Sequence, residues 1–143
     1  MYIYIRSMSE EQSRIYDKLT NASDKIVEHI VKLILYPDAQ EYNHWKGEIF
    51  SFLWKVDKLK GKNKYPSEKF LYKALSTHTD NVEVYLDVIK HMYKDQPRNI
   101  STELATECVD LYMSWLAVNF SSKGSVRPDD VYVKLDKIVE STK

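Results

Sequence analysis

The spacing of apolar residues constrains this chain more than any other feature of its sequence. Between residues 39 and 60, apolar side chains recur at alternating intervals of three and four residues: Tyr42, Trp45, Ile49, Phe52, Val56 and Leu59. An α-helix has about 3.6 residues per turn, so this spacing places all of them on one helical face. Phe50, Leu53 and Trp54 widen that face. A face so wide is typical of a helix covered by several neighbours, so we expect this helix at the centre of the fold.

The same periodicity predicts further helices on both sides of residues 39–60. Three of the four prolines and two of the three glycines stand between the periodic segments, as expected for residues that end helices or connect them. We therefore predict an all-α fold, with one domain of five or six helices spanning residues 1–143. The further segments are 9–36, 67–75, 80–95, 101–123 and 128–143.

Three local signals refine these boundaries. Ser9 with Gln12 resembles a capping box at the start of the first helix, and NAS at 21–23 could divide that helix into two. Pro128 suits the first turn of the last helix, and the two acids that follow it favour the positive end of the helix dipole. Residues 1–8 alternate in polarity instead of following helical spacing, so we expect a short extended arm there.

Composition narrows the functional class. The 143 residues carry zero formal net charge, so any binding to nucleic acid or to an anionic membrane requires a local patch. No apolar run approaches the roughly 18 residues of a membrane span. The opening MYIYIR is too short for the apolar part of a signal peptide, and a single cysteine allows no intrachain disulfide. These observations predict a cytoplasmic protein without membrane contact.

A basic segment follows the aromatic helix. Its seven lysines are accompanied by only two acids, Asp57 and Glu68. It can be interpreted as a surface for an acidic protein partner, as a phosphate-binding loop with a tyrosine stacked on a base, or as a solvated helix end. The candidate residues are Lys55, Lys58, Lys60, Lys62, Lys64, Tyr65, Lys69 and Lys73.

A second candidate site is polar. Glu41, His44 and Glu48 share one face of the 39–60 helix, and His29 lies on the preceding helix. Glu41 and His44 have the Glu-x-x-His spacing of di-iron bundles, but no second copy of that motif is present. A surface His–Glu pair is the simpler interpretation, and a metal-dependent enzyme is the alternative. We predict no metal site and no cofactor.

Sequence signatures of catalysis are missing from the chain. No nucleophile elbow, glycine-rich phosphate loop or zinc spacing occurs. Cys108 lies among apolar residues at helical spacing, which predicts a small buried hydrophobe and not a reactive thiol. These observations favour a protein that is not an enzyme.

A stretch of about 25 residues contains the pattern His-x-x-Lys-Leu, then Pro, then His-Trp-x-x-Glu-Ile. This pattern resembles that of a bacterial family of small helical proteins of unknown function. The resemblance implies a helical hairpin with His29, His44 and Glu48 in one polar cluster, and no activity. The matching residues are His29, Lys32, Leu33, Pro37, His44, Trp45, Glu48 and Ile49.

A small, neutral, helical chain of this kind is typical of a protein that binds another macromolecule. We expect an inhibitor-like or immunity-like module, of bacterial or phage origin, that occludes a protein partner. The alternatives are a nucleic-acid-associated protein, a metal-dependent helical enzyme, and self-association of the aromatic helix into a homodimer. Besides the basic segment, the fourth and fifth helices offer an acidic surface: Glu83, Asp87, Glu103, Glu107 and Asp110.

Overall fold

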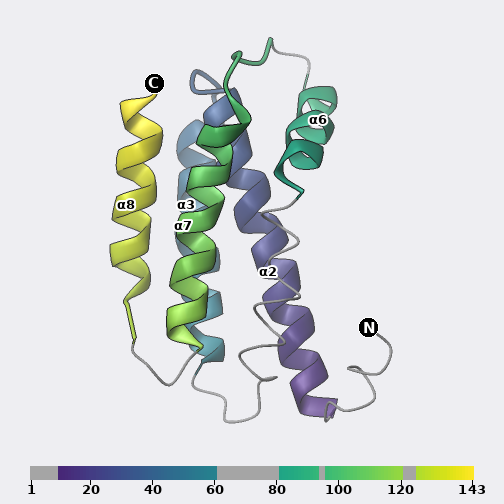
Figure 1. The fold of residues 1–143 in the computed structure, drawn as a ribbon, viewed down its shortest axis with the longest axis vertical. Helices are drawn as coiled ribbons and strands as arrows, with labels where there is room; N and C mark the ends of the chain where they lie inside the picture. Colours follow the sequence, from purple (N-terminus) through teal and green to yellow (C-terminus); the bar gives the residue numbers. More distant parts are fainter. Residues whose placement is uncertain (1–9, 61–80, 94–95, 121–124) are drawn as a thin grey trace.

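The computed structural model describes residues 10–60, 81–93, 96–120 and 125–143. Within these ranges the chain forms five helices and no strand, so the prediction of an all-α bundle is confirmed. They are α2 (Glu10–Leu35), α3 (Tyr42–Leu59), α6 (Val82–Met92), α7 (Thr102–Asn119) and α8 (Pro128–Ser141). The helices alternate in direction along the chain, and α6 and α8 lie on opposite sides of the bundle (Figure 1). The predicted arm over 1–8 and the helix over 67–75 lie outside the described residues.

α2 is the most enclosed helix of the bundle. It packs against α3, α6 and α7, whereas α3 packs mainly against α2 and α8. From Ile26 to Tyr36 every residue of the chain except Glu28 is buried. The centre expected at residues 39–60 is therefore shared with α2. The apolar spacing of α2 alone suggests less burial than the structure shows, because His29 and Lys32 are polar residues. Both are nevertheless buried, each next to an acidic partner.

α2 is continuous through residues 21–23, where the sequence suggested that it could divide. Ser23 is fully buried, and its Oγ lies 2.8 Å from the hydroxyl of Tyr112 on α7. The polar residue thus fits a tertiary contact and does not interrupt the helix. Burial raises the pKa of Tyr112 well above its usual value, so its hydroxyl keeps its proton.

The predicted apolar face of α3 is buried. Tyr42, Trp45, Ile49 and Val56 are core residues, while Phe52 and Leu59 are partly buried and pack on the core. Phe50, which was predicted to widen this face, is 38% exposed and contacts α8, where its ring lies 5.1 Å from that of Tyr132. The width of the apolar face therefore reflects two neighbouring helices, α2 on one side and α8 on the other.

The buried face of α7 is not the one marked by its large apolar residues at helical spacing. Cys108 is buried as predicted, and Trp115 is buried too, but Leu104 and Leu111 are only partly buried and Val118 is 39% exposed. The buried positions include Ala105, Val109, Tyr112, Leu116 and Asn119. α7 is covered by α2, α6 and α8 together, and the spacing of its largest side chains does not encode these directions.

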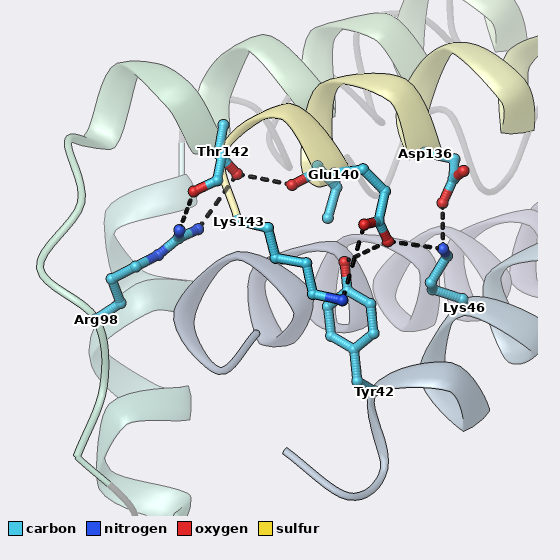
Figure 2. A network of polar contacts seen from close by, with 8 residues as sticks. Tyr42, Lys46, Arg98, Asp136, Glu140, Thr142 and Lys143 are labelled. Atoms are coloured by element: carbon cyan, nitrogen blue, oxygen red, sulfur yellow. Dashed lines mark hydrogen bonds and ion pairs between the residues drawn. The ribbon is translucent and has the colours of Figure 1, made fainter. Parts of the chain in front are cut away.

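Arg98 joins the ends of α2 and α8. Its backbone N–H donates to the carbonyl of Leu35 at 2.8 Å, and its guanidinium donates to the carbonyl of Ile34 at 2.9 Å. The guanidinium also donates to the carbonyl and the hydroxyl of Thr142 (Figure 2). The last carbonyls of a helix have no partner within the helix, so one arginine satisfies groups at two helix ends.

A second polar contact holds α3 against α8. Lys46 forms ion pairs with Asp136 and with Glu140, whose Oε1 also accepts a hydrogen bond from Tyr42 at 3.1 Å (Figure 2). Burial would lower the pKa of Lys46, but the two carboxylates raise it by more. α8 itself begins as predicted, with Pro128 in its first turn and two acids after it.

Candidate protein-binding groove

A cavity of about 900 Å³ lies between α2, α3 and the start of α6. It opens to solvent, and its lining combines lysines with a floor of apolar side chains. We call it the lysine-rimmed groove. Its described lining residues are Lys18, Asn21, Ala22, Asp24, Lys25, Glu28, Phe52, Lys55, Lys58, Leu59 and Tyr85.

The floor of the groove is apolar and firmly held. Phe52, Leu59 and Tyr85 are partly buried and pack on the hydrophobic core. The hydroxyl of Tyr85 donates to Oδ1 of Asp24 at 2.6 Å, which ties α6 to α2. Burial, reinforced by this hydrogen bond, raises the pKa of Tyr85. The floor is therefore a preformed surface that an apolar ligand group can cover.

Lysines from two helices form the rim. Lys55 lies 5.0 Å from the ring centre of Phe52, a cation–π distance. Lys25 has only a long contact with Glu28, at 3.7 Å. Lys18 and Lys58 are exposed and form no ion pair within the described part of the chain. Most of this positive charge is therefore available to an external ligand.

Among the described residues, only part of the predicted basic segment lines the groove, so these lysines do not form one continuous binding surface. Lys55 and Lys58 line it, but Lys60 points elsewhere and pairs with Asp57 at 2.9 Å. Lys60 also donates hydrogen bonds to Asn119 and Ser125, so it supports the end of α7 and the chain before α8. The remaining candidates, Lys62, Lys64, Tyr65, Lys69 and Lys73, lie outside the described residues.

The sequence analysis did not predict two residues of the groove rim. Lys18 and Lys25 are seven residues apart on α2, which places them two turns apart on one helical face. That spacing was the available signal. It could not indicate that the face lies opposite Lys55 and Lys58, because the pairing of α2 with α3 is a tertiary contact.

The predicted polar cluster forms in part. His29 on α2 and His44 on α3 both contact the carboxylate of Glu48, and Nε2 of His44 lies 2.6 Å from Oε1. The ring of His29 also packs edge-on against Phe52, with centroids 5.9 Å apart. Glu41 precedes α3, is exposed and forms no ion pair with these histidines.

The charges in this cluster stabilise one another. Burial alone would raise the pKa of Glu48, but the hydrogen bond from His29 and the charges of both histidines lower it by more. Within the described ranges, no group of three or more His, Cys, Asp or Glu side chains is placed to hold a metal ion. The cluster is thus a polar contact between α2 and α3 that lies directly behind the groove floor.

The one cysteine is also a core residue. Cys108 is fully buried, and burial raises the pKa of its thiol to about 12. Since the thiolate is the nucleophilic form, this thiol is unreactive at neutral pH.

Comparison of the chain with known protein families, with curated proteins and with solved structures finds no match in any of the three. Among the described residues, no helix has both the length and the apolar character required to cross a bilayer.

Proposed function

We propose that this chain is a non-enzymatic, cytoplasmic protein-binding module that occludes a surface of its partner. The lysine-rimmed groove would hold an acidic, amphipathic segment of that partner. The observation that supports this function is the pairing of a rigid apolar floor, including Phe52 and Leu59, with lysines from two different helices. Small binding sites of this kind combine apolar contact with a few placed charges.

The charges of the groove favour a protein over a nucleic acid. Asp24 and Glu28 belong to its lining, so a continuous track of phosphates would meet two carboxylates. A protein segment can instead place isolated acids opposite Lys18, Lys55 and Lys58, and apolar side chains on the floor. The lysines would accelerate encounter and select the partner, while the apolar floor would slow dissociation.

The groove can be tested by reversing charge on two exposed rim lysines. We expect Lys55→Glu with Lys58→Glu to lower capture of the partner by about tenfold or more, because the rim then repels an acidic segment. The matched control is Lys134→Glu with Lys137→Glu, which makes the same charge change at two exposed positions of α8. Circular dichroism would verify that both variants keep their helical content.

The measurement is affinity capture from host lysate with wild type and both variants, each with and without nuclease. A protein that wild type and the α8 control retain, and the groove variant loses, supports the proposal. Equal capture by all three forms would contradict the groove as the site. Material that disappears with nuclease would instead assign the lysines to nucleic acid.

A further inference from the structure

One face of α6 is apolar and exposed. Val84, Val88 and Met92 follow one another at intervals of four residues, which places them along a single side of the helix. Their exposed fractions are 57%, 51% and 58%. The opposite side of α6 packs on the core through Val82, Leu86 and Ile89, so the helix is apolar on two faces. Single exposed apolar residues are common, but three aligned ones on one helix indicate a contact surface.

Acidic side chains border this apolar face on the side of α7. Glu83 and Asp87 belong to α6, and Glu103, Glu107 and Asp110 belong to α7. All five are exposed, and none forms an ion pair with any described residue. A hollow of about 440 Å³ lies between these parts of the two helices, and four of these carboxylates line it together with Thr102 and Thr106.

These carboxylates differ from the acids at the contacts of α3 with α2 and α8, which have basic partners. Asp136 and Glu140 at the α3–α8 contact both pair with the ammonium of Lys46. The carboxylate of Glu48 contacts two histidines, one on α2 and one on α3. Among the described residues that line the hollow between α6 and α7 there is no lysine, arginine or histidine. Like charges gathered in a hollow repel one another, so a cationic ligand gains from every one of them.

We propose that the α6–α7 face binds a short, basic amphipathic helix of a partner protein. The apolar side of that helix would cover Val84, Val88 and Met92. Its lysines or arginines would enter the acidic hollow and pair with Glu103, Glu107 and their neighbours. α6 has 11 residues and is therefore about 16 Å long, which suits a partner segment of about three turns.

The charges argue against a second copy of the chain as the occupant. A two-fold symmetric contact between two α6 helices would place the acidic border of one copy near the acidic border of the other. That arrangement adds repulsion without adding a cation. The proposed face shares no lining residue with the lysine-rimmed groove, so the two proposals can fail separately.

The probe is a synthetic amidated peptide of about 14 residues, with leucines at helical spacing on one side and lysines on the other. Nuclear magnetic resonance of the ¹⁵N-labelled protein would locate it. We expect shift changes confined to α6 and the first half of α7, with an affinity that weakens as salt increases. A peptide of the same composition in scrambled order should bind at least about tenfold more weakly, because its apolar side is lost.

Two matched pairs of variants test the acidic and the apolar contributions. Glu103→Gln, Glu107→Gln and Asp110→Asn together should weaken binding by about tenfold. Asp17→Asn, Asp38→Asn and Glu41→Gln, at exposed positions without ion pairs, should leave it unchanged. Val84→Ser with Val88→Ser should weaken binding about threefold or more, whereas Val133→Ser, at a position 62% exposed on α8, should not.

Three outcomes would overturn the proposal. They are peptide shifts located away from α6 and α7, equal binding of the ordered and scrambled peptides, and equal effects of the test and control variants. Sedimentation of the protein alone provides a further check. A concentration-dependent dimer that Val84→Ser with Val88→Ser abolishes would assign the face to a second copy.

Discussion

His29 faces a hydrogen-bond acceptor with each of its ring nitrogens. Nδ1 lies 2.6 Å from the backbone carbonyl of Lys25, which can only accept, so Nδ1 carries a hydrogen. Nε2 meets the carboxylate of Glu48, which also accepts when it is ionised. The ring is therefore held between α2 and α3 by one acceptor on each side.

The first prediction concerns Glu48→Gln. The pKa of Glu48 is lowered in the folded protein, so its stabilising effect is present above the unfolded carboxyl pKa of about 4.3. That effect is lost as pH falls through the lower folded pKa. We expect the variant to lower the free energy of unfolding by about 1 kcal/mol at neutral pH, since the carboxylate is partly exposed. The difference should decrease as the pH falls below about 4.3 and disappear once Glu48 is protonated in the folded protein.

Urea denaturation at a series of pH values, from neutral to acidic, measures this difference. Glu41→Gln is the control, because Glu41 precedes the same helix and is exposed without an ion pair to either histidine. It should change neither the stability nor its pH dependence. A Glu48→Gln protein as stable as wild type at neutral pH would show that the His29 contact contributes nothing.

At the scale of helices, a buried hydroxyl pair joins α2 to α7. Ser23 and Tyr112 are 89 positions apart in sequence, and both are fully buried. Each hydroxyl satisfies the other in a region without solvent. Removing one of them leaves the other buried without its partner, whereas removing both leaves an apolar contact.

A double-mutant cycle should show this coupling. Tyr112→Phe and Ser23→Ala should each lower the free energy of unfolding by about 1–2 kcal/mol. The double variant should lose less than the sum, with a coupling energy of about 1 kcal/mol. Tyr132→Phe serves as the control, because Tyr132 is a partly buried tyrosine whose hydroxyl forms no hydrogen bond with the described residues. Simple additivity of the two single changes would contradict a direct hydroxyl contact.

The positions of the helices were predictable from the sequence, but the burial of their faces was predictable only in part. The helices themselves follow from local spacing, and Pro128 with its acids correctly marked the start of α8. Helical spacing alone would group Met92 with Leu86 and Ile89 in the core, but its side of α6 is exposed. A terminal residue at helical spacing is buried only if a neighbouring helix extends that far, and α6 contacts only α2 and α7 to a large extent.

At the scale of the whole molecule, the described helices share one hydrophobic core. α2 contacts α3, α6 and α7, and α8 closes the bundle against α3 and α7. We therefore predict a single cooperative unfolding transition. Trp45 and Trp54 on α3 and Trp115 on α7 provide separate reporters within the same protein.

Incorporation of 5-fluorotryptophan gives each of these residues its own ¹⁹F signal without any substitution. All three native signals should disappear at the same urea concentration, together with the helical circular dichroism signal. Loss of the Trp115 signal before the other two would contradict a single folding unit.

The whole molecule also shows how a net charge of zero can conceal strong local fields. The lysine-rimmed groove lies on the side of α6 that carries Tyr85, one of its lining residues. The acidic hollow lies on the side that carries Glu83, which lines the hollow. The two proposed binding surfaces are thus of opposite sign and adjoin the same helix. A partner with both charges could contact them together, but each can be tested by itself.

The sequence by itself determined the helical class, the helices of the described chain and the buried face of α3, because these follow from the spacing of neighbouring residues. Only the tertiary structure decided that His29 is buried against Glu48, that Lys60 supports α7, and that Arg98 joins two helix ends. It also decided that Lys18 lies across a groove from Lys58. Each of these contacts joins residues far apart in the chain, and it depends on how the helices rotate against one another, which local periodicity does not specify.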